Sequence, residues 1–170
     1  MINIAQIKGK EFLEVQKLAG KIDGIVQHPQ HIYKIMADHF GDTFFIARDE
    51  SECDKILGFL LGFISRKIKG QLFIWQIAVS EAAQGKGIGS KLLEHTINYG
   101  KKAMDCNTIM ATVETTNKPS QHLFEKFNFE IASSAFLDSY LTLIDVDGKE
   151  AVENYYNSGT DQIFYYLELE

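Results

Sequence analysis

The sequence predicts an α/β fold, or α+β in some classifications, with a mixed β-sheet flanked by helices. Short segments rich in Phe and Ile alternate with longer segments whose apolar residues recur every three or four positions. The chain is 45% hydrophobic and has only two prolines, which is enough apolar material for a substantial core. Neither an internal repeat nor a Ser/Pro-rich linker divides it, so we expect one domain over residues 1–170.

The order of these segments predicts the elements one by one. The first segment alternates like a strand, and two helical segments follow it before Gly41. Two segments rich in Phe and Ile flank a polar acidic turn and predict an antiparallel hairpin, which a third strand extends. A long amphipathic segment then predicts a helix packed on the sheet. The expected strands are 2–8, 43–48, 57–65, 71–79, 108–114 and 162–169, and the expected helices are 10–21, 32–40, 87–104 and 119–127.

Charge and cysteine content limit the classes of function. Seventeen basic against 23 acidic residues give a net charge of −6, which argues against sequence-independent nucleic-acid binding and favours small cationic or neutral ligands. Cys53 and Cys106 lack the spacing of a zinc or redox motif and suit a reducing cytoplasm. The longest apolar run, residues 56–64, is too short for a membrane-spanning helix, and the N-terminus lacks a signal-peptide core. We therefore expect a cytoplasmic protein without nucleic-acid or membrane partners.

Histidines, acidic turns and tyrosines give no site by themselves. The five histidines form neither HxxxH nor HExxH, so we assign no metal. The segment from Asp145 to Gly148 resembles only the start of a calcium loop, and a tight turn is expected there. The adjacent tyrosines of the last strand are expected to divide into one core and one surface residue. Candidates for the wall of an acceptor pocket are Tyr140, Tyr155, Tyr156, Tyr165 and Tyr166.

The densest chemical signal lies between the strand ending at Val79 and the long helix. Glycines there let backbone N–H groups converge without a Cβ in the way, and the helix N-terminus adds unsatisfied N–H donors and the positive end of its dipole. This geometry suits a diphosphate, with Lys86 at its rim. A glycine-rich helix start chosen only for close packing is the alternative. The segment consists of Gln84, Gly85, Lys86, Gly87, Ile88, Gly89 and Ser90.

Two common nucleotide motifs do not match this segment. Its spacing is GxGxG rather than the GxGxxG of dinucleotide sites, and GxxxxGK[ST] is absent. The segment resembles the [Q/R]xxGx[G/A] acyl-CoA motif of the GNAT superfamily of N-acyltransferases, which follows an apolar-Ala-Val step, here Ile77-Ala78-Val79. Residues 117–129 are similar to the family's NxxAxxLYEKxGF segment. The resemblance covers residues 43–131 and implies the GNAT fold, a mixed central sheet with splayed parallel strands flanked by helices.

The resemblance also implies where acetyl-CoA binds. Two parallel strands, ending near Val79 and Glu114, part and admit the pantetheine, which pairs with main-chain groups of Ile77 and Val79. A backbone N–H at Ile77 or Val79 is the expected donor to the oxyanion. Residues 84–90 hold the diphosphate, and Asn117 reaches the pantetheine arm. The expected cofactor-binding residues are Ile77, Ala78, Val79, Gln84, Gly85, Lys86, Gly87, Ile88, Gly89, Ser90, Asn117, Ser120 and Phe124.

A base is needed because an ammonium must lose a proton before it can attack a thioester. Glu114, at the end of a parting strand, is the candidate, and a solvated strand-end acid is the alternative. Phe124 stands where many relatives carry a tyrosine that protonates the leaving thiolate, and Thr112 stands where several carry a glutamate. Since a thiol with a reference pKa of about 8.5 leaves without an acid, the missing tyrosine is tolerable. Another acid, an ordered water or bulk solvent stays open as the base.

A narrower resemblance concerns the strand of residues 73–79, FIWQIAV. With the helix before Phe40, it is similar to the diaminobutyrate acetyltransferases of ectoine synthesis, which share an FxWQxAV strand. Strict alternation directs Trp75 into the cleft and Gln76 away from it. In that family, acids of the N-terminal helical region and the C-terminal strand hold the cationic diamino acid. The expected acceptor-binding residues are Asp23, Tyr33, Trp75 and Asp161.

Together these features predict an N-acetyltransferase that transfers acetyl from acetyl-CoA to a primary amine of a small molecule. Direct transfer in a ternary complex is expected, because neither cysteine lies near a motif. A diamino acid such as diaminobutyrate and a different small amine are both open as the acceptor. A non-catalytic acyl-CoA-binding module and a protein N-terminal acetyltransferase are the alternatives, and the choice between monomer and homodimer is open.

Overall fold

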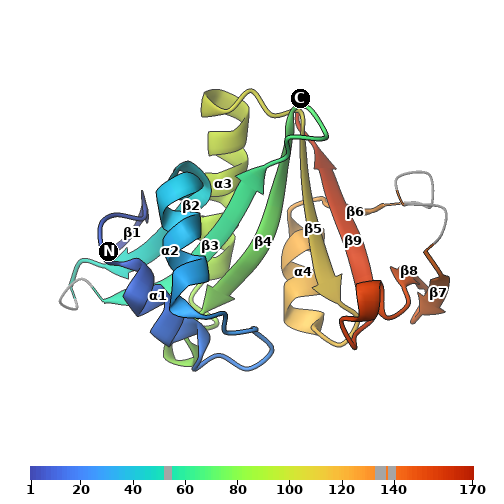
Figure 1. Ribbon diagram of the computed structural model, residues 1–170, viewed down its shortest axis with the longest axis horizontal. Coiled ribbons are helices and arrows are strands. Elements are labelled where there is room, and N and C mark those ends of the chain that lie inside the picture. The colour runs from blue at the N-terminus through green and yellow to red at the C-terminus, as the bar shows by residue number, and fades with distance from the viewer. Residues whose placement is uncertain (52–54, 133–136, 138–140) are drawn as a thin grey trace.

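The computed structural model describes residues 1–51, 55–132, 137 and 141–170, so Cys53 and Tyr140 lie outside the described residues. Within these residues, nine strands form one mixed sheet in the order β1-β2-β3-β4-β5-β9-β8-β7, with β6 paired to β9 (Figure 1). β4 and β5 run parallel, and the other pairs are antiparallel. The strands are β1 (Ile2–Gln6), β2 (Phe44–Asp49), β3 (Ile56–Ile64), β4 (Gln71–Val79), β5 (Thr108–Glu114), β6 (Glu130–Ile131), β7 (Leu143–Val146), β8 (Lys149–Val152) and β9 (Gln162–Glu168).

In the part of the chain that the structure describes, four α-helices cover the sheet, and all four agree with the expected segments to within two residues. They are α1 (Phe12–Ala19), α2 (Gln30–His39), α3 (Ile88–Ala103) and α4 (Lys118–Lys126). None of the helices in the described ranges has the length and apolar character needed to cross a membrane. The mixed α/β architecture predicted from the sequence is therefore confirmed.

Two apolar cores lie on opposite faces of the sheet. One core packs α1 and α2 against β2 to β4 and includes Val15 and Tyr33, both fully buried. The other packs α3 and α4 against the opposite face and includes Leu92 and Phe124. Burying such side chains stabilises the fold by about 1.5–3 kcal/mol each. Because helices cover both faces of the sheet, a ligand can reach the strands only where two of them separate.

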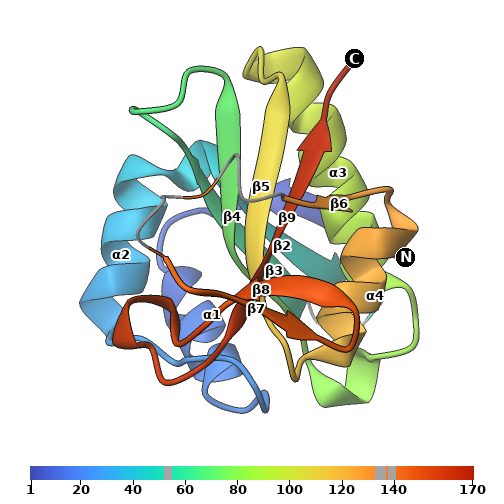
Figure 2. The same ribbon diagram turned by 90° about the vertical axis from the view of Figure 1, so that its right-hand side faces the viewer.

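The chain after residue 141 forms a hairpin that the sequence did not predict. β7 and β8 pair through Leu143↔Val152 to Val146↔Lys149, and Figure 2 shows this hairpin close to α4. Its tip has left-handed backbone at Asp147 and Gly148, with φ values of 55° and 78°. Two consecutive positive φ angles are typical of a type I′ hairpin turn, so the tight turn expected there is confirmed.

Candidate active site

β4 and β5 part midway along their length. The parallel pairing runs from Gln71↔Thr108 to Ile74↔Ala111 and goes no further. Beyond this point β4 stays paired to β3, and β5 stays paired to β9 as far as Glu114. Figure 1 shows the two strands meeting at one end and diverging toward the other. The expected splay is confirmed, and it opens a wedge between the two halves of the sheet.

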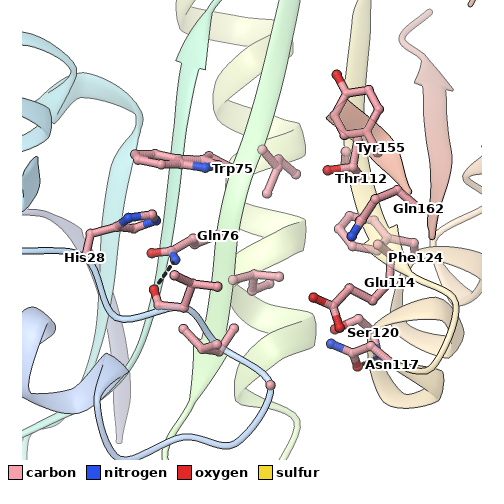
Figure 3. A pocket seen from close by; sticks show the side chains of 17 residues that line it. His28, Trp75, Gln76, Thr112, Glu114, Asn117, Ser120, Phe124, Tyr155 and Gln162 are labelled. Carbon is pink, nitrogen blue, oxygen red and sulfur yellow. Dashed lines mark hydrogen bonds between the residues drawn. The ribbon is translucent and has the colours of Figure 1, made fainter. Parts of the chain in front are cut away.

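A β-bulge in β4 coincides with the start of this wedge. The register with β3 shifts so that Leu61 pairs with Gln76 and Gly62 with Ile74, which leaves Trp75 as the extra residue. A bulge interrupts the alternation of side chains between the two faces of the sheet, and the alternation resumes one residue later. The prediction that Gln76 points away from the Trp75 side is therefore wrong. Both side chains lie toward the loop that precedes α2, as Figure 3 shows.

The bulged strand is fixed by hydrogen bonds to the helical layer. Gln76 Nε2 donates to the carbonyl oxygen of Val26 at 2.8 Å, and the Tyr33 hydroxyl donates to Gln76 Oε1 at 3.2 Å. Gln76 is 8% exposed, so its amide depends on these partners in place of water. The loop between α1 and α2 is thereby tied to β4.

A cavity of about 760 Å³ opens on the far end of the wedge, and we call it the donor cavity. Gly85 and Gly87 have φ values of 72° and 75°, and a Cβ added to either would meet nothing within 4 Å. No side chain of the described residues caps α3, so the N–H groups of its first turn point to the cavity without an intrahelical partner. These features fit a diphosphate. Expected residues that line the donor cavity are Ile77, Ala78, Val79, Gln84, Gly85, Gly87, Ile88, Gly89, Ser90, Asn117 and Ser120.

The main chain of β4 faces the wedge at alternate residues. The N–H of Ser80 donates to the Leu57 carbonyl of β3 at 2.7 Å. Because successive residues of a strand direct their peptide groups to opposite edges, the N–H and C=O groups of Ile77 and Val79 face the edge that β5 has left. An extended pantetheine can pair there as an added strand. The oxyanion role of Ile77 stays a prediction.

A second cavity of about 270 Å³, the acceptor cavity, adjoins the donor cavity. Ile25, Ile77, Asn117 and Ser120 line both cavities, so the two share a boundary. In Figure 3 one wall carries His28, Trp75 and Gln76, and the facing wall carries side chains of β5, α4 and the C-terminal region. The labelled residues of the facing wall are Thr112, Glu114, Asn117, Ser120, Phe124, Tyr155 and Gln162.

Glu114, the last residue of β5, lines the acceptor cavity. It is partly buried, and its carboxylate makes no hydrogen bond with the described part of the chain. Asn117 caps α4: its Oδ1 accepts from the Ser120 N–H at 3.1 Å, which leaves the amide nitrogen directed at the cavity (Figure 3). Within the described residues, a carboxylate without a hydrogen bond therefore lines the acceptor cavity together with Asn117, which lines both cavities.

Phe124 is buried in the wall of the acceptor cavity. Its ring lies 5.8 Å from that of Tyr165 in a stacked arrangement and 5.0 Å from that of Phe129. It is 2% exposed and lines the acceptor cavity, not the donor cavity. Tyr165 is fully buried and Tyr166 partly exposed, which confirms the expected division of this pair.

Besides Phe124, four predicted residues lie elsewhere than expected. Tyr33 lines neither cavity, and its hydroxyl binds Gln76 inside the core. Asp161 also lines neither: its carboxylate accepts from the Asn154 N–H at 2.8 Å. Asp23 lines the donor cavity rather than the acceptor cavity, and Lys86 is exposed outside both. Asp23, Lys86 and Asp161 lie on loops, whose course strand and helix patterns do not predict, and Tyr33 lies on the buried side of α2.

Several lining residues were not predicted. His28 packs against Trp75 with ring centroids 4.8 Å apart, and burial lowers the pKa of its imidazole. Gln162 enters the acceptor cavity from the start of β9. Lys126 and His122 of α4 line the donor cavity, and Lys126 Nζ donates to Ser90 Oγ at 3.2 Å. Helical spacing carried a signal for these two, since they lie four positions apart on one face of α4.

Comparison with known proteins identifies the family. Residues 11–129 match the acetyltransferase (GNAT) family. The L-2,4-diaminobutyric acid acetyltransferase of Virgibacillus pantothenticus is 33% identical over 131 residues, 77% of this chain and 80% of that protein.

Two solved structures share the fold. One is diaminobutyrate acetyltransferase EctA from Paenibacillus lautus in complex with L-2,4-diaminobutyric acid and coenzyme A, with TM-score 0.71, 20% identity and coverage of 97% and 94%. The other is the NatC complex bound to Gag peptide and CoA, with TM-score 0.78, 20% identity and coverage of 99% of both chains. The splayed strands, the uncapped α3 and the family match agree: this chain belongs to the acetyltransferase (GNAT) family and is an acetyl-CoA-dependent N-acetyltransferase.

Proposed function

We propose that the protein acetylates one amino group of a short diamino acid such as 2,4-diaminobutyrate. The observation that carries the proposal is the acceptor cavity of about 270 Å³, which Glu114 lines and which adjoins the donor cavity at Ile77, Asn117 and Ser120. Drug-sized ligands occupy about 300–1,000 Å³, so this volume suits a small metabolite better than a peptide segment. The relative from Virgibacillus pantothenticus, named for diaminobutyric acid, supports the same acceptor.

The charge of the acceptor cavity favours a cationic substrate. Among its described lining residues, Glu114 is the one acid, and none is Lys or Arg. A carboxylate in a partly buried wall attracts an ammonium more strongly than it would in open water, because the effective dielectric constant is lower there. Trp75 adds an aromatic face on the opposite wall, a surface that binds alkylammonium groups.

Bound acetyl-CoA supplies a thioester carbonyl carbon, to which the amine nitrogen bonds as the C–S bond breaks and the thiol departs. Asn117 and the main chain of Ile77 and Val79 hold the pantetheine so that this carbon lies at the junction of the cavities. The N–H of Ile77 donates to the oxygen that gains negative charge. The residues thus contribute mainly orientation and charge stabilisation.

Glu114 acts as the general base. It takes one proton from the substrate ammonium, which gives the neutral amine that attacks. The second N–H proton passes to solvent or to the thiolate, because Phe124 offers no acid and a thiol of reference pKa about 8.5 leaves readily. The net result converts an ammonium and a thioester to an amide, a thiol and one proton.

Turnover against a panel of acceptors tests the proposal. Release of free CoA from acetyl-CoA is measured with 2,4-diaminobutyrate, ornithine, putrescine, glycine and short peptides. We expect the highest kcat/KM with diaminobutyrate and negligible turnover of peptides. Turnover of peptides above diamino acids would identify a protein N-terminal acetyltransferase instead, and stoichiometric binding of acetyl-CoA without turnover would identify a non-catalytic module.

Glu114→Gln tests the base separately from the acceptor. The amide keeps the shape of the side chain but cannot take a proton, so kcat is expected to fall about 100-fold or more. Calorimetric affinity for CoA is expected to stay within about twofold, because the donor cavity does not include Glu114. An unchanged kcat would assign the proton to water or to another group.

A further inference from the structure

A buried glutamine lies directly beneath the end of β5. Gln121 of α4 is 1% exposed, and its Nε2 donates to two successive carbonyls, that of Glu114 at 3.2 Å and that of Thr115 at 2.8 Å. The Glu114 carbonyl also accepts from the N–H of Asn117 at 2.9 Å. The peptide groups that follow the candidate base are therefore held from below by one side chain.

The amide oxygen of Gln121 is also hydrogen-bonded. Lys149 Nζ of β8 donates to Gln121 Oε1 at 3.0 Å and forms an ion pair with Glu125. The Tyr165 hydroxyl of β9 donates to the same Glu125 at 2.9 Å. We call Gln121, Glu125, Lys149 and Tyr165 the Gln121 network. It ties α4, β8 and β9 together, so the glutamine cannot rotate without breaking several contacts.

The end of β5 needs such support because of the wedge. Beyond Ala111 the strand has lost its β4 partner, and its remaining edge pairs with β9 through Glu114↔Gln162. A strand bonded on one edge only has more freedom to twist than one bonded on both. At the end of β5, where β4 no longer pairs, the Gln121 side chain of α4 hydrogen-bonds the carbonyls of Glu114 and Thr115.

From this arrangement we infer that Gln121 is a positioning residue that fixes where the Glu114 carboxylate stands relative to the acceptor nitrogen. The inference rests on the proposed role of Glu114 as base. Fixing the carbonyls of two neighbouring residues fixes the direction of the intervening backbone and hence of the Glu114 side chain. A misplacement of about 1 Å at a reacting group lowers a rate by about 100-fold, so loss of this support has a catalytic effect.

Gln121→Met tests the inference, because Met fills the same volume but cannot donate to the carbonyls. We expect kcat to fall between about 10- and 100-fold, with the CoA dissociation constant within about twofold of that of the unaltered protein. Lys118→Met is the matched control. The exposed Lys118 also joins α4 to the β7–β8 hairpin, through Asp147 at 2.8 Å, but it does not touch the end of β5. Its kcat should not change.

A double-mutant cycle with Glu114→Gln separates positioning from general support. If Gln121 acts through Glu114, Gln121→Met lowers kcat less than about threefold in the Glu114→Gln background. An equal loss in both backgrounds overturns the inference, as does a lowered Tm with unchanged kcat. Full activity of Glu114→Gln alone rejects the proposed base, and with it a role for Gln121 through that base.

Lys149→Met keeps the test decisive if Gln121→Met does not fold. This variant leaves the two donated hydrogen bonds in place but frees the amide oxygen of Gln121. A fall in kcat of about three- to tenfold, absent from Lys118→Met, supports the inference. Equal kcat values for the two lysine variants contradict it.

Discussion

The imidazole of His28 lies against the indole of Trp75, with ring centroids 4.8 Å apart and ring planes inclined by 34°. His28 stands on the loop before α2, and Trp75 is the bulged residue of β4. Their contact joins a loop to a strand and forms one wall of the acceptor cavity (Figure 3). Burial lowers the pKa of His28 from its ordinary 6.5, so the neutral ring is favoured in the folded protein.

The lowered pKa of His28 predicts that stability falls with acid. Between the folded and unfolded pKa values the unfolded chain binds more protons, so the free energy of unfolding decreases as the pH falls below about 6.5. His28→Asn is expected to weaken this decrease in Tm between about pH 7.5 and 5, followed by circular dichroism. Burial lowers the pKa of His95 too, so part of the slope remains. His31→Asn, at an exposed site on α2, should keep the full slope. Equal slopes for the protein and its His28 variant would contradict the prediction.

Tyr33→Phe is expected to weaken acceptor binding from inside the core. The variant removes the donor to Gln76 Oε1, which leaves a buried acceptor unpaired at a cost of about 1–3 kcal/mol. Gln76 Nε2 also donates to the carbonyl of Val26, which lines the acceptor cavity. The KM for the acceptor should therefore rise several-fold, while the affinity for CoA is unchanged. Steady-state kinetics and calorimetry measure the two quantities. Tyr166→Phe, which removes a hydroxyl bonded to Glu130 outside both cavities, should not change the KM.

Gly87→Ala is expected to weaken CoA binding. Its φ of 75° costs an alanine about 1–2 kcal/mol, and the added Cβ projects into space where the diphosphate is proposed to lie. We expect the dissociation constant for CoA to rise at least about tenfold by calorimetry. Gly159→Ala has the same strain at φ 82° in a loop outside both cavities, so its Tm should fall without a change in CoA affinity. Similar affinities for both variants would show that residues 84–90 do not hold the cofactor.

Lys126→Met is expected to raise the CoA dissociation constant by about three- to tenfold at low salt. Lys126 lines the donor cavity beside Ser90, where its ammonium can approach a phosphate. The difference from the unaltered protein should shrink as salt is added, because exposed charges are screened. Lys91→Met removes the same charge from the exposed side of α3, outside the cavity, and should bind CoA normally. A salt-independent loss for Lys126→Met would indicate a packing effect.

Periodicity predicted the elements that carry the donor site because their signals are local. The stripe from Ile88 to Met104 predicted α3, which spans Ile88–Ala103, and the glycine segment before it needed no knowledge of distant residues. The acceptor cavity is different. Its residues come from the loop at His28, the bulge at Trp75 and the start of β9 at Gln162, and tertiary contacts bring them together.

The bulge explains the main error in predicting side-chain direction. Strict alternation predicts that the side chains of Trp75 and Gln76 lie on opposite faces of β4, but the extra residue of the bulge directs both side chains toward α2. A bulge depends on how two strands pair, so the sequence of β4 alone does not reveal it. The β7–β8 hairpin was not predicted because its strands are short: only Ala151 and Val152 are buried in them, and the clearest local signal is the turn at Asp147 and Gly148.

The shift of register at Trp75 marks a division in β4 between residues that face the acceptor cavity and residues that face the donor cavity. Residues after it present main chain to the donor, while Trp75 and Gln76 face a loop that shapes the acceptor. Thus the segments that select the two substrates are largely separate along the chain. Exchange of residues 26–28 between homologous enzymes should therefore transplant a preference for one amine over another, while the catalytic scaffold and its thioester donor stay the same.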